Sequence, residues 1–266
     1  MVREHRVSLP QGTTRYLEAG NGWPVLLLHA FPLNADMWRP QLERLVNGWR
    51  YIAPDLRGFG PERLTPAASM DDFADDVVAL LDALEIEKAT IGGLSMGGYV
   101  TFALLRRAPE RFNAVVLADT RSTADTGDGR AARGKMIDTL RSSGVAAVVD
   151  EMMPKLLGET TRRERPQVAD HVRDIALMNA AEGVAGAVAA MRDRPDSTPQ
   201  LARISVPVLL IVGEEDTLTP PTDSEAMRAD IGRAHLVDIP RAGHLSNLEA
   251  PDPFSAALAD FLIAPL

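Results

Sequence analysis

The chain has 266 residues, of which 45% are hydrophobic and 24% charged, a composition typical of one soluble globular domain with a large core. Its formal net charge of −9 argues against nucleic acid or an anionic membrane surface as a partner, because both repel an acidic protein. The absence of cysteine excludes disulfides, thiolate nucleophiles and zinc sites built on cysteine.

The N-terminal segment and the apolar runs bear on the location of the protein. Residues 1–12 are polar and of mixed charge, without the apolar stretch that is typical of a signal peptide. No apolar run approaches the roughly 20 residues that are needed to cross a bilayer. We therefore expect a cytoplasmic protein that is not bound to a membrane and is either a monomer or a homodimer.

Strand and helix patterns alternate through the first 120 residues. Residues 3–9 and 13–18 flank a turn with proline and glycine, which predicts a β-hairpin. Helical spacing of apolar residues predicts amphipathic helices at residues 71–84 and 96–107. Short, wholly apolar runs predict strands that are buried on both faces of a parallel sheet. These runs are residues 25–29, 51–53, 90–92 and 115–118.

The alternation breaks between residues 121 and 200, where helical patterns occur without a strong strand. The helices expected there are residues 130–142, 145–157, 164–179 and 183–192. The alternation returns afterwards. The elements expected in this last part are strands at 208–212 and 235–239 and a helix at 252–262. The predicted fold class is α/β, a mostly parallel, doubly wound core of residues 1–120 and 201–266 with an inserted helical cap at 121–200.

The segment Gly93-Leu94-Ser95-Met96-Gly97 matches the pattern G-x-S-x-G between a predicted strand and a predicted helix. Such a sharp turn forces its middle residue into a strained backbone, and the two glycines avoid clashes around it. The turn presents the serine hydroxyl at the carboxyl end of the sheet, beside the free N–H groups of a helix start. Ser95 is therefore the candidate nucleophile, and the alternative is a structural glycine-rich turn.

A serine nucleophile needs a base within hydrogen-bond reach, and the chain has five histidines. We expect His5, in the hairpin, and His171, in a cap helix, at the surface, and His235, at the start of a strand, in packing. His29 ends a strand, and we expect it to shape the loop that follows through hydrogen bonds. His244 lies in a loop between the last strand and the last helix. From there an imidazole can project over the sheet edge, so His244 is the favoured base.

The acid should follow another strand, in the chain order serine, acid, histidine. The apolar run at residues 208–212 is followed by Glu214, Glu215 and Asp216, and Asp216 is the favoured acid. Asp119 is the alternative acid; its other interpretation is a cap or an anchor at the entry to the helical insert. We do not expect a metal at these carboxylates, because no histidine stands at a suitable spacing.

These residues belong to a set of motifs that resembles the α/β-hydrolase superfamily, in the order of that family and over the whole chain outside the cap. The motifs are Gly93-Leu94-Ser95-Met96-Gly97-Gly98, Gly213-Glu214-Glu215-Asp216, Gly243-His244, His29-Ala30-Phe31-Pro32 and Asp55-Leu56-Arg57-Gly58-Phe59-Gly60. The resemblance implies Ser95, Asp216 and His244 as the catalytic triad. It also implies the backbone N–H groups of Phe31 and Met96 as the oxyanion hole.

Two positions depart from the pattern of the family. Ala30 stands where the family usually has glycine, which predicts a slightly altered loop. Glu62 stands, after Pro61, where the family often has serine, in a loop that supports the site without taking part in the chemistry. Neither departure concerns the triad.

Within the superfamily, the chain is most similar to carboxylesterases and 3-oxoadipate enol-lactonases, which share the serine motif and a pair like Asp119-Thr120. Ser95 argues against haloalkane dehalogenases and epoxide hydrolases, whose nucleophile is aspartate. The resemblance implies a serine hydrolase that cleaves a small carboxylic ester or lactone through an acyl-enzyme, without metal or cofactor. An enol-lactonase-like ring opening and a low-turnover ligand sensor stay open as alternatives. A perhydrolase side reaction also stays open, because peroxide can replace water at the acyl-enzyme.

The cap is expected to determine substrate specificity. Met152, Met153 and Leu156 lie together on a predicted cap helix, where they either line an acyl pocket or pack the cap onto the core. Arg121 either binds a substrate carboxylate, which an enol-lactonase would need, or forms a surface ion pair. The candidate pocket residues are His29, Arg121, Met152, Met153, Leu156 and Leu245.

Overall fold

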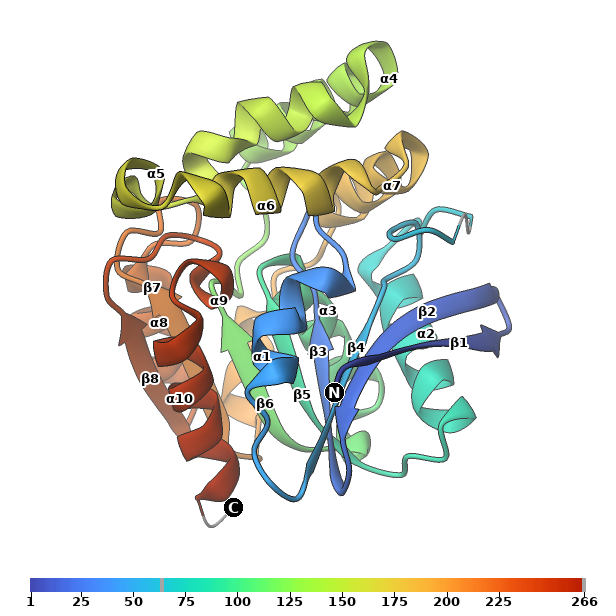
Figure 1. Cartoon of the computed structure of the whole chain (residues 1–266), viewed down its shortest axis with the longest axis vertical. Coiled ribbons are helices and arrows are strands. Elements are labelled where there is room, and N and C mark those ends of the chain that lie inside the picture. Colours follow the sequence, from blue (N-terminus) through green and yellow to red (C-terminus); the bar gives the residue numbers. More distant parts are fainter. Residues whose placement is uncertain (63–64, 265–266) are drawn as a thin grey trace.

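An eight-stranded sheet forms the centre of the protein in this computed structural model, which describes residues 1–62 and 65–264 (Figure 1). The strands are β1 (Arg3–Leu9), β2 (Gly12–Gly20), β3 (Trp23–Leu28), β4 (Trp49–Pro54), β5 (Ala89–Leu94), β6 (Phe112–Ala118), β7 (Val208–Gly213) and β8 (Ala234–Ile239). Their spatial order is β1-β2-β4-β3-β5-β6-β7-β8. The hairpin β1–β2 and the pair β2–β4 are antiparallel, and all the other neighbours are parallel.

The register of the parallel strands brings their carboxyl ends to one edge. Leu28 pairs with Gly93, Leu94 pairs with Ala118, and Gly213 pairs with Ile239. Since the chain leaves each of these strands at the same edge, the loops that follow them lie side by side. The loops that carry the predicted nucleophile, acid and base therefore converge there.

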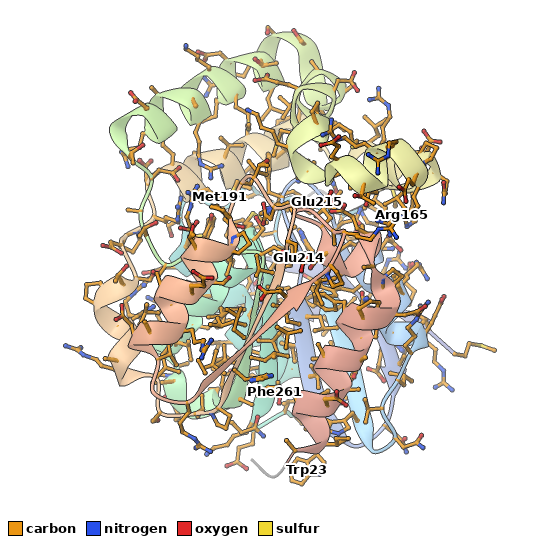
Figure 2. The ribbon with its side chains drawn as sticks, turned by 90° about the vertical axis from the view of Figure 1, so that its left-hand side faces the viewer. Trp23, Arg165, Met191, Glu214, Glu215 and Phe261 are labelled. Atoms are coloured by element: carbon orange, nitrogen blue, oxygen red, sulfur yellow. The ribbon has the colours of Figure 1, made fainter. Side chains whose placement is uncertain are left out.

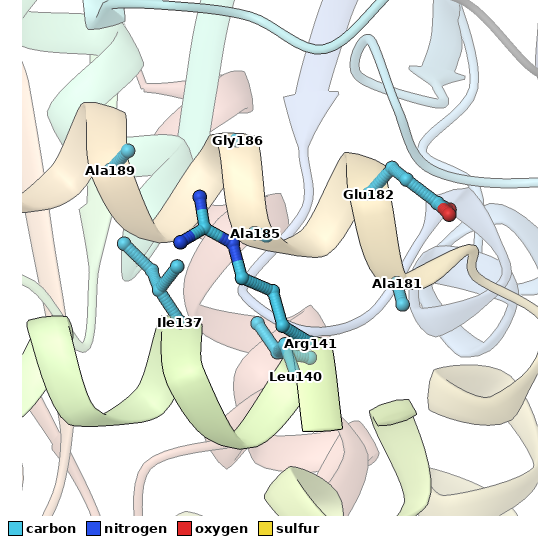
Figure 3. A pocket seen from close by; sticks show the side chains of 8 residues that line it. All are labelled: Ile137, Leu140, Arg141, Ala181, Glu182, Ala185, Gly186 and Ala189. Atoms are coloured by element: carbon cyan, nitrogen blue, oxygen red, sulfur yellow. The ribbon is translucent and has the colours of Figure 1, made fainter. Parts of the chain in front are cut away.

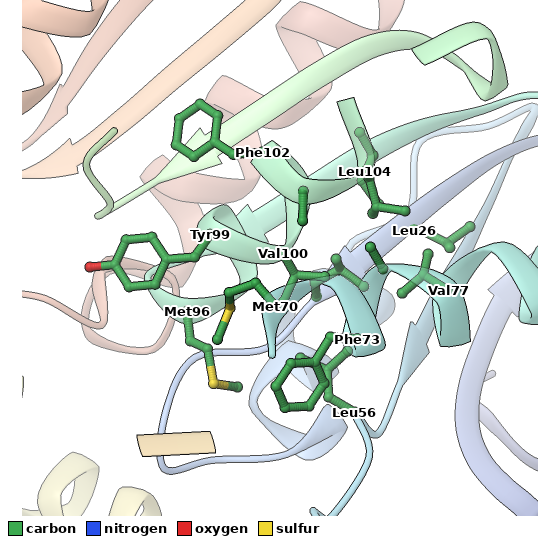
Figure 4. Packing of buried hydrophobic residues seen from close by; sticks show 14 of the residues in the cluster. Leu26, Leu56, Met70, Phe73, Val77, Met96, Tyr99, Val100, Phe102 and Leu104 are labelled. Atoms are coloured by element: carbon green, nitrogen blue, oxygen red, sulfur yellow. The ribbon is translucent and has the colours of Figure 1, made fainter. Parts of the chain in front are cut away.

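Helices cover both faces of the sheet, as the doubly wound prediction requires. The core helices are α1 (Arg39–Glu43), α2 (Met70–Ala83), α3 (Met96–Arg107), α8 (Pro221–Asp230), α9 (Ser246–Glu249) and α10 (Pro251–Ile263), with short 3₁₀ turns at Ala35–Trp38, Pro109–Arg111 and Thr198–Arg203. On one face, α2, α3 and α8 pack against Leu26 of β3 and its neighbours (Figure 4). On the other face, α1 and α10 belong to the hydrophobic cluster that includes Leu27, with α1 against β2 and α10 against β7 and β8. Each central strand therefore buries both of its faces, which explains the wholly apolar runs.

The helical insert lies over the carboxyl edge of the sheet, at the top of Figure 1. Its helices are α4 (Gly127–Leu156), α5 (Glu159–Glu164), α6 (Pro166–Leu177) and α7 (Ala181–Arg192). Gly144, with φ 77° and ψ −175°, interrupts α4, so that its two parts match the two helices expected on either side of residue 144. The cap boundaries at residues 120 and 200 stay a prediction.

Some expected elements differ from the observed ones. The helix expected at residues 164–179 begins only at Pro166, because Arg165 has non-helical dihedrals and proline favours the first helical position. Helices α1, α5, α8 and α9 have no counterpart in the expectations, since they are short or bury few side chains. His235 is exposed rather than packed, because β8 is an edge strand.

Neither membrane crossing nor metal binding finds support in the part of the chain that the structure describes. No single helix there is long and apolar enough to cross a bilayer. Helices α6 and α7 pass the criteria of length and composition only as a pair, and they are bent by 99°. Among the same residues, no cluster of three His, Asp or Glu side chains could hold a metal ion.

The burial of two phenylalanines predicts different costs of truncation. Phe73 on α2 is 0% exposed between the helix and the sheet (Figure 4), whereas Phe261 on α10 is half-buried (Figure 2). We expect Phe73→Ala to lower the free energy of unfolding by about 3–5 kcal/mol, because it leaves a cavity in the core. We expect Phe261→Ala to lower it by about 1 kcal/mol. Urea denaturation measures both changes, and equal losses would contradict the packing described.

Candidate active site

Ser95 lies at the sharp turn between β5 and α3, with φ 54° and ψ −110°. This conformation is strained for a residue with a side chain. A Cβ atom on Gly93 would lie 2.2 Å from the carbonyl of Gly97, and one on Gly97 would lie 2.2 Å from the carbonyl oxygen of Leu28. Both positions therefore require glycine. The carbonyl oxygen of Ser95 accepts a hydrogen bond of 2.9 Å from Thr120 Oγ1, which ties the turn to the loop after β6.

The structure joins Ser95, His244 and Asp216 into one hydrogen-bonded chain. His244 Nε2 lies 2.8 Å from Ser95 Oγ, and His244 Nδ1 lies 2.8 Å from Asp216 Oδ2. Because a carboxylate only accepts hydrogen bonds, Nδ1 carries the proton and Nε2 accepts from the serine hydroxyl. All three residues are at most 8% exposed. The arrangement can remove a proton from Ser95 and stabilise the imidazolium that results.

The loop after β7 holds Asp216 in its charged form. Asp216 Oδ1 accepts from the backbone N–H groups of Leu218, at 2.8 Å, and Thr219, at 3.0 Å. Thr219 Oγ1 donates to Asp216 Oδ2 at 2.7 Å and lies 3.2 Å from His244 Nδ1. Burial favours the neutral carboxyl, but the neighbouring His244 and the hydrogen bonds outweigh it and lower the pKa of Asp216. The sequence analysis missed Thr219, although aspartate followed by threonine three residues later is a turn signal.

Asp119, the alternative acid, has a different set of partners. Its Oδ1 accepts from the backbone N–H of Gly213 at 2.8 Å, and its Oδ2 accepts from Ser246 Oγ at 2.5 Å. Burial, followed by the negative charge of Asp216, raises the pKa of Asp119 well above its usual value. Asp119 makes no hydrogen bond to His244 within the described residues. It anchors the end of β7 to the start of α9 and does not orient the base.

The backbone N–H groups of Phe31 and Met96 are the predicted oxyanion donors. Met96 is the first residue of α3, so its N–H has no acceptor within the helix. Phe31 lies in the wall of the cavity that contains Ser95. Neither N–H donates to another group of the protein in the described part of the chain. Their role as oxyanion donors stays a prediction.

His29 shapes the loop that carries Phe31, as expected from its place after β3. Its Nδ1 donates to the carbonyl oxygen of Ala30 at 3.0 Å, and its Nε2 accepts from the backbone N–H of Leu56 at 3.0 Å. The ring also packs edge-on against Phe59, with 4.8 Å between the centroids. His29 is completely buried, so it holds the loop in place without reaching the cavity.

A cavity of about 200 Å³ opens onto Ser95 and His244, between the core and the cap. Its core side includes Phe31, Tyr99 and Arg121. Its cap side, from α4 and α7, includes Met136, Met152 and Met191. Methionine side chains adapt to ligands of different shape, so this wall fits a range of acyl groups.

Two of the predicted pocket residues, Arg121 and Met152, line this cavity. The other four, which are His29, Met153, Leu156 and Leu245, do not line it. Met153 and Leu156 instead follow the alternative of packing between cap and core. Leu156 and Leu245 are 0% exposed and belong to the hydrophobic core beneath the cap. On α4, Met152 and Lys155 share the face toward the cavity, while Met153 lies on the adjacent face and packs against that core.

The arginines in the cavity wall differ in whether a carboxylate is paired with them. Asp125 pairs with two guanidinium groups, that of Arg133 at 2.5 Å and that of Arg194 at 2.7 Å. Arg121 has no carboxylate oxygen within 4.0 Å in residues 1–62 and 65–264, and its buried Nε atom has no hydrogen-bond partner there. Tyr99 and the more distant carboxylates of Asp223 and Asp125 also act on Arg121, but neither of these carboxylates is paired with it. Arg121 can therefore bind an anionic group in the cavity.

A larger cavity, of about 460 Å³, lies between α4 and α7 (Figure 3). Small residues of α7, such as Ala185 and Gly186, face Ile137, Leu140 and Arg141 of α4 across it. None of the three hydrogen-bonded residues lines it. The smaller cavity is therefore the candidate active site.

Comparison with known families agrees with this geometry. A family model described as the alpha/beta hydrolase fold matches residues 24–251. The chain belongs to the α/β-hydrolase family. The family membership and the mostly parallel, doubly wound sheet confirm the fold class that the motifs implied.

Relatives of this α/β hydrolase include esterases and enol-lactonases, as the sequence motifs indicated. A thermophilic esterase from Thermogutta terrifontis, solved with malate bound, is 38% identical, with a TM-score of 0.93 and 98% of both chains covered. The 3-oxoadipate enol-lactonase 2 of Acinetobacter baylyi is 31% identical, covering 85% of this chain and 83% of the relative. The enol-lactonase of Burkholderia xenovorans LB400 is 27% identical, with a TM-score of 0.88 and coverage of 97% and 99%.

The buried His29 predicts a loss of stability in mild acid. Burial lowers the pKa of His29 to about 4, whereas a histidine in the unfolded chain has a pKa of about 6.5. Between these values the unfolded chain binds a proton that the folded protein does not bind, so stability falls as the pH falls. From pH 7 to pH 5 we expect His29 to lower the free energy of unfolding by about 2 kcal/mol.

Urea denaturation at pH 7 and pH 5 measures this contribution. In His29→Gln the loss between the two pH values should be smaller than in the wild type by that amount, because the titrating group is gone. The exposed His171 provides the control variant His171→Gln, which should behave like the wild type. The same loss in all three proteins would contradict the assignment.

Proposed function

We propose that this α/β hydrolase is a serine hydrolase that cleaves a small carboxylic ester or lactone through an acyl-enzyme intermediate. The observation that carries the proposal is the hydrogen-bonded chain of Ser95, His244 and Asp216, with Ser95 and His244 facing a cavity. Esterases and enol-lactonases among the relatives support the same substrate class.

Acylation begins when His244 Nε2 removes the proton of Ser95 Oγ as that oxygen attacks the carbonyl carbon. Asp216 holds the imidazole with Nδ1 protonated and stabilises its positive charge. The N–H groups of Phe31 and Met96 stabilise the negative oxygen of the tetrahedral intermediate. Each such donor contributes about 2.7–4 kcal/mol to the stability of a transition state of this kind.

Acylation ends when His244 gives its proton to the leaving oxygen, which breaks the ester bond and leaves the acyl group on Ser95. In a lactone, the leaving oxygen remains part of the same acyl chain, so that hydrolysis gives one ring-opened product. In deacylation, His244 removes a proton from water as the water oxygen attacks the acyl carbon. His244 then returns this proton to Ser95 Oγ, which breaks the bond between that oxygen and the acyl carbon and releases the acid.

The proposal predicts that Ser95→Ala abolishes ester hydrolysis. With p-nitrophenyl butyrate we expect kcat/KM to fall by about 10³-fold or more, because the acyl-enzyme cannot form. Ser8→Ala, at an exposed position on β1, is the matched control and should retain the activity. Full activity in Ser95→Ala would contradict the mechanism. Negligible turnover in the wild type, with tight binding of an ester analogue, would instead support a ligand sensor.

We further propose that the acyl part of the preferred substrate carries a carboxylate, as in the enol-lactonase alternative. The supporting observation is Arg121, whose guanidinium lies in the cavity wall without a paired carboxylate in the described part of the chain. A carboxylate there would form charge-assisted hydrogen bonds with the guanidinium. Neighbouring Arg133 is already paired with Asp125 and is less suited to this role.

Removal of the Arg121 charge should lower the hydrolysis of carboxylated esters much more than that of neutral esters. We expect Arg121→Gln to lower kcat/KM for p-nitrophenyl hemiglutarate by about 10- to 100-fold, the usual worth of a charged hydrogen bond. We expect p-nitrophenyl butyrate, which is neutral, to change by less than about threefold. Arg141→Gln, in the larger cavity, is the control. An equal loss on both esters would contradict a carboxylate site at Arg121.

A further inference from the structure

One short cap segment contacts both loops that carry the residues around Ser95. This segment, residues 158–165, comprises Gly158, helix α5 and Arg165, and we name it the clamp segment. Its Thr160 donates twice to the carboxylate of Glu215, from the backbone N–H at 2.8 Å and from the hydroxyl. Glu215 directly precedes Asp216, so the clamp segment holds the loop of the acid.

A buried carboxylate joins the same segment to the loop of the base. Glu249 is 1% exposed. Its Oε2 accepts from the backbone N–H of Gly158 at 2.9 Å, and its Oε1 accepts from the backbone N–H of Leu245 at 3.1 Å. Leu245 directly follows His244. Glu249 therefore connects the backbone of the cap to the backbone of the histidine loop.

Arg165, at the C-terminal end of the clamp segment, donates hydrogen bonds to the core. Its Nη2 donates to the carbonyl oxygen of Arg241 at 2.8 Å, and its Nη1 donates to the carbonyl oxygen of Glu249. In Figure 2, Arg165 and Glu215 both lie where the cap meets the core. The two loops are also joined directly, because the backbone N–H of Glu215 donates to the carbonyl oxygen of Ala242 at 2.8 Å.

The contact between the clamp segment and the histidine loop has no spare room. A Cβ atom on Gly243 would lie 2.2 Å from the backbone nitrogen of Gly158. A Cβ atom on Gly158 would lie 2.9 Å from the backbone nitrogen of Gly243 and 2.5 Å from Glu215 Oε2. Two glycines therefore cross at van der Waals distance, and the position of one backbone determines the position of the other.

We propose that the clamp segment fixes the relative position of His244 and Asp216, with Glu249 as the positioning residue. This inference rests on the proposed serine hydrolase function. Glu249 does not line the catalytic cavity, so it acts through the backbone on either side of it. The docked cap segment adds to the direct bond between the two loops and holds the base and the acid at hydrogen-bond distance.

The chemistry of Glu249 makes this role specific. Its two carboxylate oxygens satisfy two buried N–H groups, which would otherwise lose their hydrogen bonds at a high energetic cost. A glutamine side chain has only one oxygen, and its NH₂ group would face the second N–H. Glu249→Gln therefore breaks one of the two links at nearly constant volume, and the histidine loop shifts relative to Asp216.

The test separates positioning of the base from closure of the cavity. We expect Glu249→Gln to lower kcat for p-nitrophenyl butyrate by about tenfold while KM changes by less than about twofold, because substrate contacts are intact. We expect a similar decrease in the rate at which paraoxon phosphorylates Ser95 with release of p-nitrophenolate. Glu159→Gln, which changes an exposed carboxylate on helix α5 of the clamp segment, is the control and should match the wild type.

Each other outcome would overturn the proposal. A rise in KM with unchanged phosphorylation by paraoxon would show that the clamp segment serves only to enclose substrate. A lower melting temperature with unchanged kcat would show a merely structural role. If Glu249→Gln does not fold, Thr160→Val removes only the hydroxyl link to Glu215 and should lower kcat by about threefold, again with KM unchanged. An unchanged kcat in Thr160→Val would then reject the proposal.

The failure of this proposal and that of the proposed function are distinguishable. Retained hydrolysis in Ser95→Ala would reject the serine hydrolase itself. Loss of hydrolysis and of phosphorylation by paraoxon in Ser95→Ala, together with wild-type behaviour of Glu249→Gln, would reject only the clamp segment as a positioning element.

Discussion

The strained turn at Ser95 is the constraint on which the rest of the site depends. A left-handed backbone at a residue with a side chain costs about 1–3 kcal/mol, and it persists only where the surroundings enforce it. Here the enforcement comes from close backbone contacts, those of Gly93 with Gly97 within the turn and those of Gly97 with Leu28 at the end of β3. The same turn directs the Ser95 hydroxyl toward His244 and begins α3, whose first N–H has no acceptor in the part of the chain that the structure describes. The candidate nucleophile and one predicted oxyanion donor thus follow from one local conformation.

The parallel register of the strands places the other loops of the candidate site beside this turn. Because adjacent strands end at the same edge, the loops after β3, β5, β7 and β8 meet there without any long excursion of the chain. The sheet is buried on both faces and supports these loops rigidly. The cavity at this edge is lined from both sides, by the loops of the core and by helices α4 and α7 of the cap. The core and the cap therefore both contribute to the candidate site.

Much of this arrangement could be predicted from the sequence, because its signals are local. Wholly apolar runs marked the buried strands, and a glycine-flanked serine between strand and helix marked the turn. Glu249 was missed, since its role arises from hydrogen bonds to distant segments. Thr219 was missed because its local bonds to Asp216 do not reveal that it also reaches His244. Whether Met153 lines the cavity or packs against the core could not be decided from the sequence, because helical periodicity reveals two faces without revealing which one the core covers. The sequence likewise did not indicate that β8 lies at the edge of the sheet.

The crossing of Gly158 and Gly243 limits how this scaffold can be redesigned. A foreign cap grafted onto the core would have to supply a residue without a side chain where it passes the histidine loop. A graft that lacks it would push that loop outward, whatever its fit to a new substrate. Exchange of caps between homologous scaffolds should therefore include the junction glycine as part of the module.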